Sequence, residues 1–147
     1  MKKLVDNIIQ LYCEFDHANL DALGDIYHRN IVFVDPVHRL KGLDDLVSYF
    51  KSTMQGTSEC VFSFSSPIVD GTNACLEWQM HYRHPKLKGG DRLTLDGVSR
   101  VQIAGEQGAD MRIIYQRDYY DLGAMLYEHI PVLGRVVGSL KNRLAVQ

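Results

Sequence analysis

Apolar side chains recur every three or four residues in the first third of the chain, which is the period of amphipathic helices. The apolar stripe of the first predicted helix consists of Leu4, Val5, Ile8, Ile9, Tyr12 and Phe15. After a turn at 16–19, in which Asn19 can act as a helix cap, the second predicted helix carries Leu20, Leu23, Ile26 and Tyr27. A short apolar strand at 31–34 and a break at Gly42 come next. The third predicted helix then carries Leu43, Leu46, Val47, Phe50 and Met54 on one face.

The pattern changes to strands in the second half of the chain. Four apolar runs, separated by turn-forming residues, cover 60–64, 74–84, 92–103 and 111–120. After them Asp121 is placed to cap a helix over 122–128, and an amphipathic stretch follows at 135–144. This order predicts an α+β fold, in which a curved antiparallel sheet follows three N-terminal helices and a helical tail ends the chain.

Composition narrows the class of protein without naming a function. The chain has 147 residues, enough for one domain, and its 46% hydrophobic and 23% charged residues are typical of a globular protein. A net charge of −2 predicts no general attraction to nucleic acid, and no apolar run reaches the length of about 20 residues that stable membrane insertion needs. Three widely spaced cysteines, Cys13, Cys60 and Cys75, fit neither a disulfide framework nor a zinc site. Together with an acidic residue early in the N-terminal segment, they predict a cytoplasmic protein.

Two aspartates lie beside apolar or aromatic residues, where a charged carboxylate is costly unless it is bound or used. Asp35 follows the strand at 31–34 and precedes Pro36, a pairing that serves equally well to end a strand in a turn. Asp118 lies in the last strand, and alternation places it on one face with Gln116 and Tyr120. A structural ion pair with an arginine is the alternative for Asp118. Both aspartates are therefore candidates for a functional site.

The segment 20–50, with Asp35-Pro36-Val37 after its strand, and the run 117–122 resemble signatures of the nuclear-transport-factor-2-like superfamily. The similarity is to its SnoaL-like and steroid-isomerase-like branch and covers about residues 4–125. It implies a domain at 1–125, followed by an amphipathic helical tail at 126–147. It also implies a cone in which the sheet wraps round the three helices and encloses one deep, apolar pocket. The expected ligand is a small apolar or cyclic molecule, and no cofactor is expected.

Three activities of this superfamily make different demands on the residues. Steroid isomerases imply Asp35 as the base and Tyr12 as a hydrogen-bond donor, but their third partner corresponds here to Ser99. Limonene-epoxide hydrolases match Asp118, yet the arginine and second aspartate they need are replaced over 77–79 by Glu-Trp-Gln, which predicts against epoxide hydrolysis. Polyketide cyclases ask for one pocket aspartate or histidine, which Asp118 with His38 or His81 would supply.

The expected function is therefore binding of a small molecule, with acid–base proton transfer in an isomerisation or an aldol-type cyclisation as the expected chemistry. The alternative is a non-catalytic ligand-binding or interaction module of the same fold. The candidate catalytic residues are Asp35, Asp118 and Tyr12. The candidate ligand-binding residues are His38, Trp78, His81, Ser99, Gln116 and Tyr120. No metal site is expected, because His81 and His84 should point to opposite faces of a strand.

The run 74–83 gives two conflicting orientations. Alternation places Leu76, Trp78, Met80 and Tyr82 on one apolar face, whereas the register of the superfamily turns residues 77 and 79 towards the pocket. Both hold if the apolar face packs against a second subunit, which predicts a homodimer. The tail, with its apolar residues and few positive charges, is expected to cap the pocket mouth or to pack on that partner.

Overall fold

The computed structural model describes residues 2–14, 17–105 and 110–145, the side chains of 17–19 excepted. Its helices near the N-terminus are α1 (Lys2–Cys13), the 3-10 helix η1 (His17–Ala22), α2 (Leu23–Ile26) and α3 (Leu43–Gly56). The strands are β1 (Tyr27–Val34), β2 (Arg39–Lys41), β3 (Glu59–Phe64), β4 (Ile68–Asp70), β5 (Asn73–Arg83), β6 (Leu93–Ala104) and β7 (Arg112–Tyr120). A short 3-10 turn, η2 (Lys88–Gly90), joins β5 to β6. The chain ends in α4 (Leu122–Met125), η3 (Tyr127–His129) and α5 (Leu133–Ala145).

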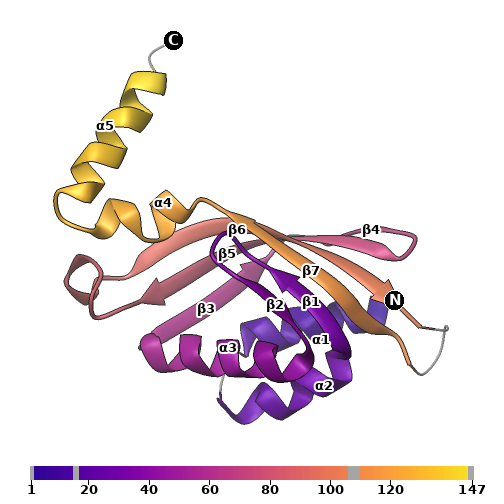
Figure 1. Ribbon diagram of the computed structural model, residues 1–147. Coiled ribbons are helices and arrows are strands. Elements are labelled where there is room, and N and C mark those ends of the chain that lie inside the picture. The colour runs from indigo at the N-terminus through magenta and orange to yellow at the C-terminus, as the bar shows by residue number, and fades with distance from the viewer. Residues whose placement is uncertain (1, 15–16, 106–109, 146–147) are drawn as a thin grey trace.

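A curved seven-stranded sheet bends over α1, α2 and α3, which lie against one of its faces (Figure 1). The strand order is β2-β1-β7-β6-β5-β3, with β4 paired to β5. The predicted α+β class and its curved sheet over N-terminal helices are therefore confirmed. One pair departs from the expected antiparallel arrangement, because β1 runs parallel to β7.

The second predicted helix is shorter than expected. Its first part is the 3-10 helix η1, α2 ends at Ile26, and Tyr27 already belongs to β1. Tyr27 is buried in the sheet, and its hydroxyl donates a hydrogen bond to Gln116 of β7, which favours the extended backbone over another helical turn. The predicted cap at Asn19 involves a side chain outside the described residues. The predicted break at Gly42 is confirmed: its φ of 96° is one that glycine adopts without strain.

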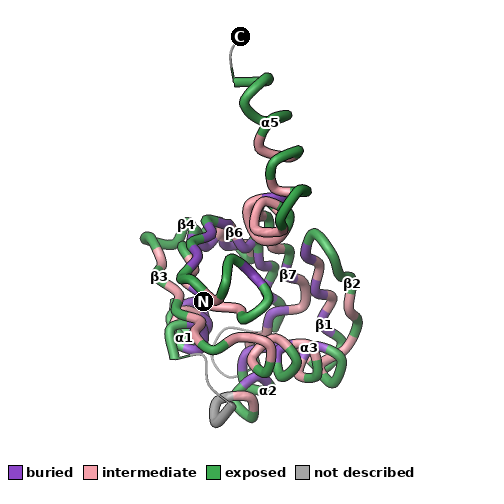
Figure 2. Tube along the Cα trace, turned by 90° about the vertical axis from the view of Figure 1, so that its left-hand side faces the viewer, coloured by how far each residue is buried: buried purple, intermediate pink, exposed green. Residues whose placement is uncertain are grey.

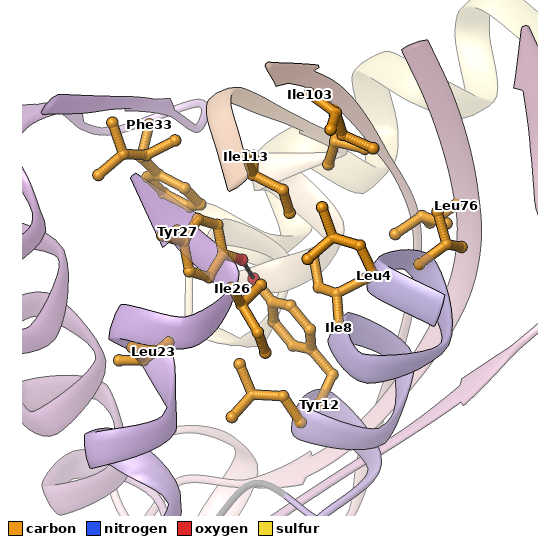
Figure 3. Close-up of a cluster of buried hydrophobic side chains, with 14 of the residues drawn as sticks. Leu4, Ile8, Tyr12, Leu23, Ile26, Tyr27, Phe33, Leu76, Ile103 and Ile113 are labelled. Atoms are coloured by element: carbon orange, nitrogen blue, oxygen red, sulfur yellow. Dashed lines mark hydrogen bonds between the residues drawn. The ribbon is translucent and has the colours of Figure 1, made fainter. Parts of the chain in front are cut away.

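The main core lies between the sheet and the helices. Leu4, Ile8 and Tyr12 of α1 pack there with Tyr27 and Phe33 of β1, and a dashed line joins the hydroxyls of the two tyrosines (Figure 3). Their side chains come from residues far apart in the sequence. The polar hydroxyls are thus enclosed by apolar packing and need partners within the protein.

The conflict over the run 74–83 is settled in favour of simple alternation. Leu76, Trp78 and Tyr82 are buried on the inner face, whereas Glu77 and Gln79 are exposed on the outer face. The expectation that residues 77 and 79 face the pocket is wrong, because turning them inward would bury a carboxylate and an amide in place of apolar side chains. The reason given for a homodimer therefore no longer holds, because the apolar face of β5 is already covered within one chain.

The C-terminal residues form two short helices and one longer helix that projects from the body. Asp121 caps α4 as predicted, accepting hydrogen bonds from the backbone N–H groups of Gly123 and Ala124. The predicted amphipathic helix exists as α5, but it points away from the sheet and has no buried residue (Figure 2). It does not cap the pocket mouth. Among the described residues, no helix is long and apolar enough to cross a membrane.

Candidate functional site

A cavity of about 250 Å³ lies between the inner face of the sheet and the helices α1 and α3. Most of its wall is apolar and aromatic, including Phe50, Phe62 and Leu95. The hydroxyl, imidazole and carboxyl groups in the wall belong to Tyr12, His38, Tyr49, Thr53, Ser99, Asp118 and Tyr120. An apolar chamber with a few polar groups is the usual form of a site for a small organic molecule.

Asp118 is the carboxylate that lines this cavity, and it is held through one oxygen. Ser99 Oγ donates to its Oδ1 at 2.6 Å, and Gln116 Nε2 donates to the same atom at 2.9 Å. Within the described part of the chain, Oδ2 accepts no hydrogen bond from the protein. Burial in the apolar wall, and to a smaller extent the charge of Asp35, raises the pKa of Asp118 from 3.8 to about 6, while the two hydrogen bonds oppose the rise.

A buried network supports Asp118 from behind. Gln116 is fully buried, and its Nε2 donates both to Asp118 and to the Tyr12 hydroxyl, the latter at 3.0 Å. Its Oε1 accepts from the Tyr27 hydroxyl at 2.7 Å, and the two tyrosine hydroxyls lie 3.3 Å apart. Because both ends of the amide are bonded, the side chain of Gln116 has one orientation and presents an N–H to Asp118.

A second line of support runs through Trp78. Its indole Nε1 donates to Ser99 Oγ at 2.9 Å, so that the Ser99 hydroxyl proton is directed to Asp118. Trp78 reaches this position because Gly97 lies opposite it in β6: a Cβ at Gly97 would lie 2.2 Å from the indole ring. Gly97 therefore provides the space that this indole orientation requires.

Asp35 has a different environment, in the turn between β1 and β2. Its Oδ1 accepts the backbone N–H groups of Val37 and His38 at 2.7 and 2.5 Å, and its Oδ2 accepts the Tyr49 hydroxyl at 2.7 Å. The side chain is only 1% exposed and does not line the cavity. The turn role that its position before Pro36 allowed is therefore present.

The two aspartates nevertheless lie close to each other. In the parallel pair of β1 and β7, Val34 is opposite Arg117, so Asp35 and Asp118 follow at the same end of neighbouring strands. Both line a smaller outer hollow of about 240 Å³. This proximity is the reason why the charge of Asp35 contributes to the raised pKa of Asp118.

The cavity brings together most of the predicted site residues. Those that line it are Tyr12, His38, Trp78, Ser99, Asp118 and Tyr120. Gln116 lies behind the wall, and Asp35 lies outside it. His81 is on the outer face of β5, where its Nδ1 is 2.9 Å from Thr94 Oγ1, so its predicted place in the pocket is wrong for the same reason as that of residues 77 and 79.

Two tyrosines of the site were not predicted. Tyr49 lies on α3 beside the predicted apolar stripe, and its hydroxyl reaches the turn at Asp35. Its helical spacing from Leu46 was the one signal that it faces inward. The helical period predicts a helix at Tyr27, but Tyr27 begins β1, and its hydroxyl donates a hydrogen bond to Gln116.

The curved sheet, the helices that it wraps round and the apolar cavity between them are the features of the NTF2/ketosteroid-isomerase-like fold. A protein of this fold from Catenulispora acidiphila, in complex with trimethylamine, superposes with a TM-score of 0.69 at 15% identity, covering 84% of this chain and 88% of that one. A candidate SnoaL-like polyketide cyclase from Jannaschia gives 0.72 at 14% identity, covering 85% and 90%. A candidate isomerase of the SnoaL-like family from Agrobacterium tumefaciens gives 0.62 at 18% identity, covering 81% and 95%.

The chain belongs to the SnoaL-like domain family, whose pattern matches residues 8–111. The resemblance noted in the sequence is thereby confirmed. No curated protein matches the chain.

Proposed function

We propose that the protein binds a small apolar cyclic molecule in the cavity and catalyses proton transfer on it, as an isomerase or an aldol-type cyclase, with Asp118 as the acid–base residue. The observation that carries the proposal is the state of this carboxylate. Its Oδ1 is fixed by Ser99 and Gln116, and its Oδ2 accepts no hydrogen bond among the described residues. Asp118 itself is part of the wall of an apolar cavity.

The pKa of about 6 suits this role. A general base works best when its pKa lies near the working pH, since it is then ionised and still takes up a proton readily. Tyr12 lines the same cavity, and burial raises the pKa of its hydroxyl well above the ordinary value of 10.0, so it stays neutral. Since the Tyr27 hydroxyl donates to Gln116, the Tyr12 hydroxyl donates to Tyr27, and Tyr12 would support Asp118 through Gln116. In an isomerisation, Asp118 would take a proton from the carbon beside a carbonyl group and return it to another carbon.

The comparisons support a ligand of this size class. The Catenulispora protein was obtained with trimethylamine, a small molecule, and the names of the Jannaschia and Agrobacterium proteins refer to polyketide cyclisation and isomerisation. Each of them shares the fold with this chain at low identity, so the argument for chemistry rests on Asp118.

The test uses cyclohex-3-enone, a small cyclic ketone whose isomerisation to the conjugated cyclohex-2-enone is followed by ultraviolet absorbance. The protein is expected to accelerate this conversion, and Asp118→Asn to lower kcat/KM by about 10²–10⁴-fold. Asp70→Asn, at an exposed position on β4, is the matched control and should keep the full rate.

An Asp118→Asn variant with the full rate would refute the proposal. Chemical-shift changes in the cavity on ketone binding, without any turnover by the unmodified protein, would instead support a non-catalytic ligand-binding module.

A further inference from the structure

His38 is a second proton-handling group in the wall of the cavity. It ends the turn that follows β1, and its imidazole lines the cavity whereas Asp35 does not. Its Nδ1 lies 3.1 Å from both Oδ1 and Oδ2 of Asp35. The carboxylate therefore holds one edge of the imidazole from outside the cavity.

Asp35 is bound too fully to take a proton from a ligand itself. Two backbone N–H groups and the Tyr49 hydroxyl donate to it, in addition to its contact with His38. Its side chain is shielded from the cavity and from solvent. A carboxylate in this arrangement fixes the orientation of its neighbours, as second-layer carboxylates do for histidines in many sites.

The consequence for His38 is a defined tautomer. With Nδ1–H directed to Asp35, the remaining ring nitrogen, Nε2, is on the opposite edge of the imidazole. Within the described residues Nε2 makes no hydrogen bond, and the side chain is 43% exposed. The Tyr49 ring packs against the imidazole with 4.9 Å between centroids, which limits its rotation. Nε2 is thus the atom of His38 available to a molecule in the cavity.

We propose that His38 is a second catalytic acid–base residue, which serves the carbonyl oxygen of the ligand through Nε2, and that Asp35 and Tyr49 are positioning residues for it. This inference rests on the proposed function of Asp118. Asp35 would then position His38, whereas the resemblance to steroid isomerases implied that Asp35 is itself the base.

The two groups complete one reaction without any other reactant. As the Asp118 carboxylate takes the proton from the carbon beside the carbonyl group, the electron pair of that C–H bond forms a C=C bond. The carbonyl π pair then accepts the Nε2 proton of His38, which enters the reaction protonated on both ring nitrogens. This step gives a dienol and leaves His38 as the Nδ1-protonated tautomer that Asp35 favours. In the second half, His38 takes the hydroxyl proton back, and Asp118 delivers its proton to the far carbon. Both residues return to their starting states, and the double bond has moved into conjugation.

The first experiment compares histidine variants in the cyclohex-3-enone assay. His38→Gln is expected to lower kcat/KM by about 10²-fold or more. His81→Gln, a matched histidine on the outer face of the same sheet, should keep the full rate. His38→Ala should recover part of its activity when imidazole is added to the solution, which a structural role of the side chain would not produce.

The second experiment tests the positioning residues. Tyr49→Phe is expected to lower kcat/KM by about 10-fold in the otherwise unmodified protein but to cause no further loss when His38 is already glutamine, because residues acting through one group are non-additive. Nitrogen NMR of the neutral imidazole should show the Nδ1-protonated tautomer, and Asp35→Asn should abolish this preference.

The outcomes separate this inference from the proposed function. Full activity of His38→Gln, together with an inactive Asp118→Asn, overturns the role of His38 and leaves that of Asp118 standing. Equal losses from Tyr49→Phe with and without His38 overturn the positioning role. Full activity of Asp118→Asn overturns the proposed function itself.

Discussion

Replacing Asp118 with asparagine should make the protein more stable at neutral and alkaline pH. The folded state raises the pKa of this carboxyl from 3.8 to about 6, so ionisation of the group opposes folding. The cost is absent below about pH 4, grows as the pH rises between the two values, and at its maximum, above about pH 6, reaches about 3 kcal/mol. Asparagine removes the charge but keeps an Oδ1 that accepts from Ser99 and Gln116.

Urea unfolding from about pH 4 to pH 8 measures this effect directly. The difference in unfolding free energy between Asp118→Asn and the unmodified protein should rise with pH, from near zero to about 1–3 kcal/mol in favour of the variant. Asp70→Asn, the exposed control, should differ by less than about 0.5 kcal/mol at every pH. If the variant is less stable than the parent at pH 8, or if the difference in unfolding free energy does not depend on pH, burial does not disfavour the ionised form of Asp118 as argued.

Three further predictions concern the surroundings of the site. Gly97→Ala places a methyl group 2.2 Å from the Trp78 indole, so it should lower the unfolding free energy by about 1–3 kcal/mol and shift the tryptophan emission. Tyr27→Phe leaves the buried Oε1 of Gln116 without its donor and should cost about 1–3 kcal/mol in urea unfolding. Deleting residues 133–147 should lower the thermal unfolding midpoint only slightly, because α5 has no buried residue and contacts the body through solvent-exposed ion pairs from Lys141 to Asp121 and Glu128.

Local patterns were enough to predict most of the fold. The helical period at the N-terminus, the four apolar runs and Asp121 at the start of a helix each depend on neighbours in the sequence, and each is present in the structure. Short elements escaped this reasoning. The three-residue strands β2 and β4 are held by pairing with longer strands, and Tyr27 is drawn into β1 by a partner 89 residues away.

The candidate site was harder to predict, because its residues are selected by the face on which they lie and by their partners. Asp118, Ser99 and Trp78 alternate correctly along their strands, and simple periodicity places them inside. His81 was included because of the resemblance to polyketide cyclases and lies on the strand face that the superfamily register turns inward, although simple periodicity already placed it outside. Tyr49 required knowledge of how α3 packs against the turn at Asp35, which no local pattern contains.

The two neighbouring aspartates differ in the hydrogen-bond donors that each receives, which favours different proposed roles for them. Asp35 is satisfied by two backbone N–H groups and a tyrosine hydroxyl, which makes it a fixed acceptor for His38. Asp118 has its two donors on one oxygen, and its other oxygen accepts no hydrogen bond from the part of the chain that the structure describes. A sequence shows that both are acidic and near apolar residues. The proposed difference between them depends on hydrogen bonds that form where α3 meets the turn after β1 and where β6 pairs with β7. For that reason activity should depend more on Asp118 than on Asp35.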